Sequence, residues 1–242
     1  RMYMEATYMR GIRVGFVPTS LLAMVDAAIG GKNGVDVGVY KNLVGIIRQP
    51  SFLFFDVSLL QTLPEAEWQN GFAEIIKHAC IKDAAMFKEL AGHTIDYYRK
   101  NKKAAAALVK RNALLKTKVV QGDEHETGDR KLLNYGHTLG HALENQYELS
   151  HGQAVAIGMT YAADISVKET GFKDAGKVVS LISQYGLPTY AEFDAQKVFE
   201  VLKHDKKRER SGLHYVLLAK IGKGQVKTIP LETVKQIIQE LN

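Results

Sequence analysis

A stripe of polar residues runs through an otherwise apolar segment at positions 134–141. If this segment is helical, Asn134, His137 and His141 lie on one face, and leucine and alanine occupy the other faces. A polar face in apolar surroundings needs partners or a ligand, and two histidines four residues apart can hold one metal ion. The alternative is two structural histidines bonded to carbonyl groups. Two glycines within the segment, each costing about 1 kcal/mol in a helix, favour the close approach of another group.

A third histidine and a carboxylate complete a candidate set of metal ligands. His151 opens a helix of small residues, where the positive helix end disfavours the imidazolium and favours the neutral ring that a metal needs. Glu74 is the best carboxylate candidate because it lies on an apolar helix, on one face with Lys77 and His78. Two histidines, one carboxylate and an open position are typical of catalytic zinc. From spacing alone, an ordinary Glu–Lys helix pair is the alternative.

Basic residues next to glycines indicate a binding site for an anion. The run from Val25 to Lys32 ends a helical turn in two glycines followed directly by lysine, although it lacks the spacing of a Walker loop. Other polar residues are surface residues by default when each is taken alone: Lys41, Asn42, Lys116, Arg130 and Lys206.

The elements that must position these residues differ along the chain. Gly11 to Pro18 is typical of a short strand and Ser51 to Val57 of a buried strand, with a helical turn at Leu21 to Ile29 and a glycine-rich stretch at Gly30 to Gly34 between them. Two strands cannot form an independent sheet core. We therefore expect residues 1–60 to be the tail of an α/β domain whose earlier part lies before Arg1.

Residues 61–242 are predicted to form a second, mostly helical domain. Thr62 to Glu65 has the pattern of a capping box with proline at the first helical position, which predicts a helix to about Asp83. A hairpin is predicted over Leu213 to Ile229 and a terminal helix from Leu231. The fold class is thus α+β. Further helices are predicted at Ala84 to Lys100, Lys102 to Val120, Leu132 to Tyr147, Gly152 to Thr170 and Lys173 to Tyr185.

Composition narrows the class of protein. The chain has 242 residues, of which 46% are hydrophobic and 24% charged, which excludes a disordered chain, a collagen and a coiled-coil rod. Its longest apolar runs are too short to span a bilayer, and no signal peptide is recognisable. The single cysteine, Cys80, fits a reducing cytoplasm. The net charge of +6 by default indicates a basic, solvated surface, and the basic residues are not interleaved with aromatics as in nucleic-acid-binding motifs. The lysines beside glycines and helix ends add weight to a third explanation, a small anionic substrate.

Taken together, these segments resemble the 3-dehydroquinate synthase family over nearly the whole chain. The resemblance implies the tail of an NAD-binding α/β domain, followed by a mostly helical domain that binds metal and substrate. The matching motifs are PTSLLAMVDAAIGGK (18–32), KNLVG (41–45), LPEAEWQNGFAEIIKH (63–78), GDEHETGDRKLLNYGHTLGHALE (122–144), HGQAVAIGM (151–159) and HDKK (204–207).

The resemblance assigns roles to individual residues. Glu74, His137 and His151 are similar to the family's zinc ligands, with cobalt as an alternative metal. His141, which spacing alone would place on the metal, is similar instead to a contact of the substrate phosphate. The resemblance further implies that the substrate carboxylate is bound by Lys32, Lys116 and Arg130, and the phosphate by Asn42, Asn134 and Lys206, with Arg10 from a second subunit. Hydroxyl groups of the substrate would be bound by Asp26 and Lys77. The implied contacts of NAD are Thr19, Ser20, Lys41, Thr62, Leu63 and Glu67.

The implied reaction belongs to aromatic amino acid biosynthesis and is carried out by a homodimer. The substrate, 3-deoxy-D-arabino-heptulosonate 7-phosphate, carries a carboxylate and a phosphate, which fits a ring of Lys, Arg, Asn and His. Zinc-assisted oxidation by NAD is followed by phosphate elimination, reduction, ring opening and an intramolecular aldol closure to 3-dehydroquinate.

The sequence departs from the family pattern in several places. The glycine-rich pyrophosphate loop is expected before Arg1, so we expect zinc binding but weak NAD binding and little turnover. Asn33, Tyr40 and Ser20 replace the residues usual at their positions. Three alternatives follow from these departures and from the fold: another sugar-phosphate cyclase acting on a substrate without a carboxylate, a polyol dehydrogenase, and a non-catalytic helical domain kept for dimer contact.

Overall fold

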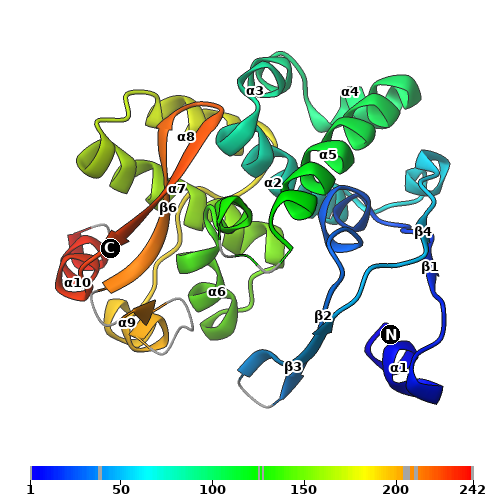
Figure 1. Cartoon of the computed structure of the whole chain (residues 1–242). Coiled ribbons are helices and arrows are strands. Elements are labelled where there is room, and N and C mark those ends of the chain that lie inside the picture. The colour runs from blue at the N-terminus through cyan, green and yellow to red at the C-terminus, as the bar shows by residue number, and fades with distance from the viewer. Residues whose placement is uncertain are drawn as a thin grey trace.

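The computed structural model describes residues 2–37, 40–124, 126, 128–203, 208–209 and 212–240, with the backbone alone for residues 2–3, 36–37, 40–43, 145 and 208–209. A helical body occupies most of the molecule, and a smaller segment of short strands precedes it in the chain (Figure 1). The α+β class predicted from the sequence is confirmed. Within the described ranges, no helix is long and apolar enough to cross a membrane.

Helix α2 (Glu65–Lys82) lies at the centre of the helical body and packs against α3 (Ala84–Ala91), α5 (Lys102–Gly122), α7 (His151–Thr170) and α8 (Ala175–Gln184). The short α4 (Ile95–Lys100) leads into α5. Residues 70–81 of α2 are all buried, because neighbouring helices cover it on every side. A helix that is buried all round requires a reason for each polar side chain on it.

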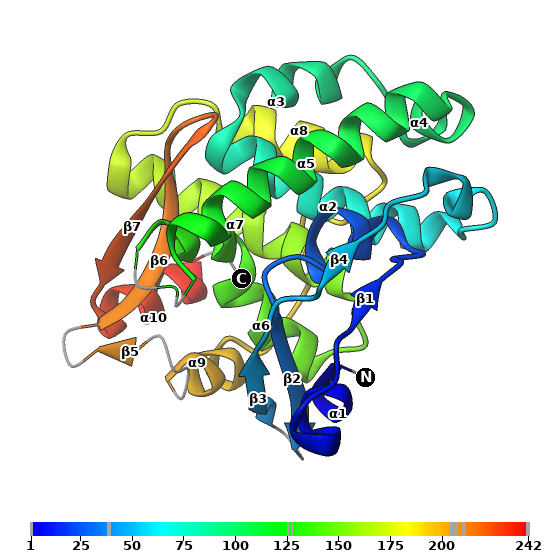
Figure 2. The same ribbon diagram turned by 45° about the vertical axis from the view of Figure 1, so that its right-hand side comes forward.

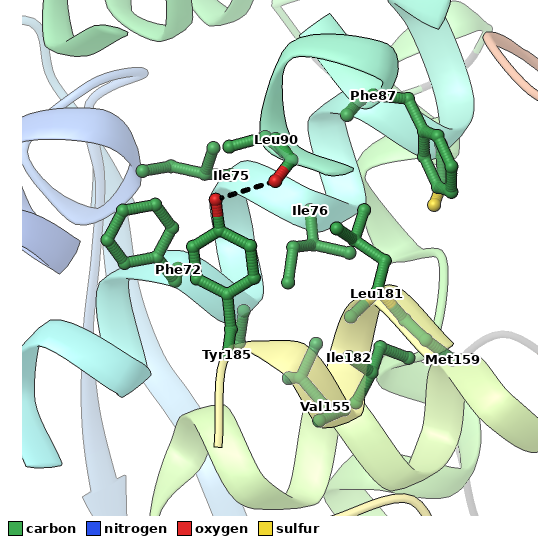
Figure 3. Packing of buried hydrophobic residues seen from close by; sticks show 14 of the residues in the cluster. Phe72, Ile75, Ile76, Phe87, Leu90, Val155, Met159, Leu181, Ile182 and Tyr185 are labelled. Atoms are coloured by element: carbon green, nitrogen blue, oxygen red, sulfur yellow. Dashed lines mark hydrogen bonds between the residues drawn. The ribbon is translucent and has the colours of Figure 1, made fainter. Parts of the chain in front are cut away.

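The main apolar core lies between α2, α3, α7 and α8, as Figure 3 shows. Phe72 and Ile76 of α2 meet Val155 of α7 and Ile182 of α8 in this cluster. The Tyr185 hydroxyl donates a hydrogen bond to the carbonyl oxygen of Leu90 at 3.1 Å, which satisfies its polar tip inside the core. The core therefore fixes α2 and α7, the two longest apolar helices, against each other.

A three-stranded antiparallel sheet closes the C-terminal side, in the order β5 (Arg208–Glu209), β6 (Gly212–Lys220) and β7 (Lys223–Ile229). Strand β6 packs on α7, and a second apolar cluster joins it to the helices around it (Figure 2). Those helices are α6 (His137–Gln146), α9 (Ala195–Lys203) and α10 (Leu231–Glu240). The predicted hairpin and terminal helix are confirmed, whereas α9 was not predicted.

The N-terminal segment consists of short elements that lie to one side of the helical body (Figures 1 and 2). Strands β1 (Gly15–Phe16) and β4 (Phe52–Leu53) form a parallel pair, and β2 (Lys32–Val37) and β3 (Tyr40–Ile47) form an antiparallel hairpin. Helix α1 (Met2–Thr7) packs against this hairpin. The remaining elements are the 3-10 helix η1 (Tyr8–Arg10), the π-helical turn η2 (Ala23–Ala27) and the 3-10 helix η3 (Val57–Leu60).

Three predictions about elements were wrong in detail. The strand predicted over 51–57 pairs only at Phe52–Leu53, and the Phe52 and Phe54 side chains are 59% and 58% exposed because no described element covers them. The helix predicted over 84–100 is interrupted at Gly92, which ends α3. Helix α2 begins at Glu65 without a capping box, since Pro64 has an extended ψ of 153° and no side chain caps the helix.

The helix predicted over 132–147 is two elements. A 3-10 helix, η4 (Asp129–Asn134), ends at Asn134, and α6 begins only at His137. Gly136 lies between them with a φ of 78°, a left-handed conformation that favours glycine. Asn134 therefore does not belong to the helical stripe of His137 and His141, which corrects the sequence interpretation.

Candidate metal and substrate site

Glu74, His137 and His151 converge at the centre of the molecule, and their ligand atoms lie within 4.8 Å of one another. Each comes from a different helix, since Glu74 is on α2 and the histidines open α6 and α7. Both imidazole Nε2 atoms face the same carboxylate oxygen: Glu74 Oε1 lies 3.0 Å from His151 and 3.4 Å from His137. Glu74 is fully buried, so this carboxylate has no access to solvent.

The spacing of these three atoms fits zinc. Bond lengths of about 2.0–2.1 Å to nitrogen and oxygen in a tetrahedron place neighbouring ligand atoms roughly 3.3 Å apart. The separations of 3.0 and 3.4 Å lie on either side of that value. One carboxylate and two imidazoles leave a fourth position open, as in catalytic zinc sites. The donor set therefore fits the metal.

The outer nitrogens of the two histidines are also engaged. His137 Nδ1 lies 3.1 Å from the carbonyl oxygen of Tyr135, which can only accept a hydrogen bond. A proton on Nδ1 satisfies this carbonyl and would leave Nε2 free to bind a metal beside Glu74. His151 Nδ1 lies 3.7 Å from Glu144 Oε2. Such outer partners fix the tautomer and the ring plane of a histidine that binds metal.

The electrostatics of the histidines partly contradict the sequence interpretation. Burial and the nearby Lys77 ammonium lower the pKa of His137, so its ring is neutral as a metal requires. At His151 burial acts in the same direction, but the carboxylates of Glu144 and Glu74 outweigh it and raise the pKa to about 9. Contrary to the expectation from the sequence, the positive end of α7 therefore does not keep His151 neutral in the metal-free protein.

Glycines allow the backbones of α6 and α7 to approach closely. A Cβ added at Gly158 would lie 1.9 Å from the Gly136 carbonyl oxygen, and one at Gly140 would lie 2.9 Å from that of Ala154. The prediction that the glycines of this segment accommodate another group is confirmed, and that group is α7. This contact sets the position of His137 relative to His151.

Asn70 joins α2 to the beginning of α7. Its side-chain oxygen accepts hydrogen bonds from Ser150 Oγ at 2.7 Å and from the Gly152 amide at 3.0 Å. These two residues flank His151, and Asn70 lies one helical turn before Glu74. Ser150 and Gln153 also form a capping box at this helix start. Sequence reasoning missed Asn70, and only its burial among apolar residues of α2 could have indicated it.

A second group of charges surrounds the carboxylate of Asp26 beside the metal ligands. Lys116 Nζ lies 2.8 Å from Asp26 Oδ1 and donates to the Asp26 carbonyl at 2.7 Å, while Lys77 pairs with both Glu74 and Asp26. Burial alone would raise the pKa of Asp26, but the Lys116 and Lys77 ammonium groups hold it well below its usual range. The same pairing keeps the pKa of Glu74 low and that of Lys77 high. Both carboxylates are therefore charged.

Asp26, Glu74 and His78 form a second set of atoms within 4.8 Å of one another. This set is unsuited to a cation, because ammonium groups already pair with both carboxylates. His78 is instead held by Asn112, whose Oδ1 lies 3.0 Å from His78 Nδ1. The three-ligand set with His137 and His151 is the better metal site.

On the side of the N-terminal segment, Lys32 and Asn134 meet at Glu126. Its carboxylate pairs with Lys32 and accepts a hydrogen bond from the Asn134 amide. Glu126 adopts a φ of 60°, which is unusual for a residue other than glycine. The family resemblance implies that Lys32 binds the carboxylate and Asn134 the phosphate of a substrate, and the structure brings both side chains to one carboxylate. Sequence reasoning missed Glu126, which no spacing pattern distinguishes.

His141 lies close to the metal ligands without being one of them. Its ring stands edge-on to that of His137, with centroids 5.2 Å apart. In the part of the chain that the structure describes, it does not belong to either three-residue ligand set. Its half-buried side chain is on the same face of α6 as His137, one turn further along.

Lys116 and Arg130 meet the same turn of the chain. Lys116 binds the carbonyl of Asp26, and Arg130 donates to the carbonyls of Gly30 at 2.9 Å and Glu124 at 2.6 Å. Both side chains are more than nine-tenths buried. The pKa of Lys116 is lowered by burial, which the Asp26 carboxylate only partly offsets. The two residues therefore hold the turn that leads from η2 to Lys32.

Five of the six positions predicted to contact NAD lie just before η2 or at the beginning of α2. Leu21 packs on Gly71, which brings the preceding Thr19 and Ser20 toward the first half of α2. Thr62 is exposed, and Leu63 and Glu67 are half-buried, at the beginning of that helix. Arg10 is exposed and forms no hydrogen bond or ion pair with any described residue. Three predicted residues lie outside the described part: Lys206 altogether, and Lys41 and Asn42 as side chains.

A helical domain with a buried cluster of one glutamate and two histidines, preceded by a segment of short strands, is the class of protein that this fold and site define. Family models match two consecutive parts of the chain: the 3-dehydroquinate synthase N-terminal model over residues 2–70 and the C-terminal model over residues 71–208. The chain belongs to the 3-dehydroquinate synthase family.

Curated relatives agree with this assignment. The chain is 41% identical over 234 residues to the 3-dehydroquinate synthase of Geotalea uraniireducens, an alignment that covers 94% of this chain and 65% of that protein. It is 40% identical over 249 residues to the enzyme of Prochlorococcus marinus, covering 99% of this chain and 67% of that protein. The chain thus spans about two thirds of the length of these relatives.

Two synthases of known structure, each with NAD+ and a metal ion bound, have the same fold. The 2-epi-5-epi-valiolone synthase of Streptomyces hygroscopicus, with NAD+ and Zn2+ bound, is 26% identical with a TM-score of 0.88, over 99% of this chain and 69% of that one. A 2-deoxy-scyllo-inosose synthase complexed with carbaglucose-6-phosphate, NAD+ and Co2+ is 27% identical with a TM-score of 0.86, over 100% and 70%.

Proposed function

We propose that this chain carries the metal and substrate site of a 3-dehydroquinate synthase. Its substrate is 3-deoxy-D-arabino-heptulosonate 7-phosphate, and its products are 3-dehydroquinate and phosphate. The observation that carries the proposal is the convergence of Glu74, His137 and His151 next to the charged groups of Asp26 and Lys77. Identity to the cyclases that make valiolone or inosose is lower, at 26–27% against about 40% for the 3-dehydroquinate synthases, which supports this substrate over theirs.

Glu74, His137 and His151 would hold a zinc ion, with cobalt as the alternative that one related cyclase contains. A bound zinc ion supplies a Lewis acid that polarises an oxygen of the substrate. The chain's own contribution is a buried and already converged set of ligands, which costs little reorganisation when the metal binds. Asp26 and Lys77 lie beside this set and would orient the hydroxyl groups of the substrate.

Lys32, Asn134 and His141 would bind the anionic groups of the substrate, together with Asn42, Lys206 and, from a second subunit of a homodimer, Arg10. Glu126 marks the place, because its carboxylate is already held there by Lys32 and Asn134. Lys116 and Arg130 would bind the substrate carboxylate beside the turn at Asp26 to Gly30, whose carbonyl groups they contact. Anion recognition by such groups relies on charge-assisted hydrogen bonds.

NAD would bind where Thr19 and Ser20 approach the beginning of α2, as part of an NAD-binding domain that includes residues 1–60. Both related cyclases contain NAD+, which supports this assignment. NAD supplies the hydride acceptor of the reaction. We place the protein in the cytoplasm, where the buried, free Cys80 stays reduced.

Metal content and substrate preference test the proposal. Mass spectrometry of the purified chain should find about one zinc or cobalt ion, lost in Glu74→Gln and kept in Glu65→Gln, an exposed carboxylate on the same helix. Calorimetry with NAD present should show tighter binding of 3-deoxy-D-arabino-heptulosonate 7-phosphate than of glucose 6-phosphate, and the preference should fall in Arg130→Gln. A metal-free chain, or equal binding of the two sugar phosphates, would overturn the assignment.

A further inference from the structure

The His151 ring lies between two carboxylates that come from different helices. Its Nε2 is 3.0 Å from Glu74 Oε1 on α2, and its Nδ1 is 3.7 Å from Glu144 Oε2 on α6. The Glu74 carboxylate is part of the candidate metal site. Glu144 is the only carboxylate among the described residues that is paired with the outer nitrogen of a metal-ligand histidine.

Helix α6 carries the candidate metal ligand His137 and also Glu144, the partner of the second histidine ligand, His151. His137 and Glu144 are seven residues apart, so they lie on the same face of this helix. The α6 backbone is fixed against α7 by the close contacts at Gly136 and Gly140. The distance between Glu144 and His151 is therefore set by packed backbone, even though 20% of the Glu144 side chain and 30% of that of His151 remain exposed.

The two metal-ligand histidines differ in the group that contacts their outer nitrogen, Nδ1. His137 donates through Nδ1 to the neutral carbonyl of Tyr135 and is almost wholly buried. His151 is the more exposed ring and sits at the very start of α7, where a ring can turn about χ2. A carboxylate at Nδ1 is a stronger acceptor than a carbonyl, so the less enclosed ring has the stronger partner.

We propose that Glu144 is a positioning residue for the metal site: a shift of a few tenths of an ångström from the present 3.7 Å lets its carboxylate accept the Nδ1 proton of His151 and so keep Nε2 directed at the metal. The inference rests on the proposed function, because it assumes that Glu74, His137 and His151 bind the ion. Outer-shell carboxylates of this kind typically contribute about 10- to 100-fold to metal affinity. Glu144 touches neither metal nor substrate, and its effect is exerted through His151.

Zinc affinity, measured by competition with a chelator, separates this role from a general charge effect. Three variants of the full chain are compared with the wild type: Glu144→Ala, Glu144→Gln and Glu148→Gln. In Glu144→Gln, the new amide oxygen can still accept the hydrogen bond from Nδ1 without carrying a charge. Glu148 lies four residues further along and is exposed, so its substitution makes the same change in charge at a carboxylate that is not paired with His151.

We expect Glu144→Ala to weaken zinc binding about 10- to 100-fold, Glu144→Gln to weaken it several-fold, and Glu148→Gln to leave it within about twofold. Nitrogen-15 NMR of the zinc-loaded wild type should show His151 protonated at Nδ1, and this signal should be broadened or lost in Glu144→Ala. Urea unfolding of the metal-free variants checks that each is folded. If Glu144→Ala does not fold, the loss in Glu144→Gln decides.

The results that would contradict the role of Glu144 differ from the result that would contradict the proposed function. Wild-type affinity in Glu144→Ala or, if that variant does not fold, in Glu144→Gln would overturn the role of Glu144 and leave the metal site intact. An equal loss in Glu144→Gln and Glu148→Gln would also overturn it, since general charge would then explain the effect. A wild-type chain that binds no zinc at all would overturn this inference together with the proposed function.

Discussion

The two ends of the candidate site are built in different ways. At the metal end, Glu74, His137 and His151 come from three packed helices, and Glu74 is completely buried. At the anion end, Lys32 comes from the N-terminal segment, with about half of its side chain exposed, and it pairs with Glu126 from the chain between α5 and η4. The first end is fixed by backbone contacts, whereas the second depends on side chains that water can reach.

This difference indicates that one end is built to hold a metal ion and the other to bind and release an anionic substrate. A metal ion needs its ligands within tenths of an ångström, which packed helices provide. An anionic substrate has to enter and leave, so the groups that bind it must be accessible and must exchange partners. At present Lys32 and Asn134 have such a partner in Glu126. We therefore expect changes at the metal end to cost more than equal changes at the anion end.

The largest effect is expected from Gly158→Ala. The new Cβ would lie 1.9 Å from the Gly136 carbonyl oxygen, so α6 and α7 must separate. Overpacking of this kind costs about 3 kcal/mol of the free energy of unfolding, measured by urea titration of the metal-free protein. Gly176→Ala in α8 is the matched control: nothing lies within 4 Å of its Cβ, and it should stabilise the protein by up to about 1 kcal/mol. Equal effects of the two would contradict the close packing.

Much of the metal end was predictable from sequence, because its residues stand in long helices whose apolar pattern is clear. Glu74 on an apolar helix and His151 before a run of small residues were recognisable in this way, and the glycines near His137 indicated close packing. The break at Gly136 was not, because a left-handed glycine leaves no trace in periodicity. Asn134 was therefore placed on the wrong helix.

The anion end was harder to predict for a physical reason. Its residues are joined across long sequence separations, Lys32 to Glu126 and Arg130 to Gly30, and such pairings depend on tertiary structure alone. The β2–β3 hairpin was also missed, since its glycines favour a loop when they are considered locally. The exposure of Phe52 and Phe54 contradicts their apolar pattern, which predicts a buried strand.

The second-largest effect is expected from a change in pH, which alters the zinc affinity of the metal end. The pKa of His151 is about 9 in the metal-free protein, so zinc must displace a proton from this ring at any lower pH. The apparent affinity should therefore rise roughly tenfold per pH unit between pH 6 and 8. His137 contributes less to this slope than His151, because burial lowers its pKa. Chelator competition at several pH values measures the slope, and a flat profile would contradict the His151–carboxylate pairing.

A smaller effect is expected from Asn70→Ala. The substitution removes the acceptor of Ser150 Oγ and of the buried Gly152 amide on either side of His151. Leaving a buried donor unpaired costs about 1–3 kcal/mol, and we expect roughly a tenfold loss of zinc affinity as His151 shifts. Asn70→Asp keeps the acceptor and should recover most of the affinity. If both variants bind zinc like the wild type, Asn70 does not set the position of α7.

The smallest effect is expected at the anion end. Lys32→Ala should weaken the binding of inorganic phosphate roughly threefold, in the range of an exposed ion pair, and leave the metal content unchanged. Glu126→Gln should strengthen phosphate binding, because it removes a competing carboxylate from Lys32. Lys110→Ala, an exposed lysine on α5, is the control. Loss of metal in Lys32→Ala would show that the two ends are not independent.

The central claim is that three helices hold a zinc ion through one carboxylate and two imidazoles. X-ray absorption of the zinc-loaded chain tests it most directly, because the fine structure reports the number and kind of first-shell atoms. We predict two imidazole nitrogens and oxygen ligands at about 2.0–2.1 Å, without sulfur. Scattering from sulfur at about 2.3 Å, which Cys80 would produce, or a shell with no imidazole would contradict the account.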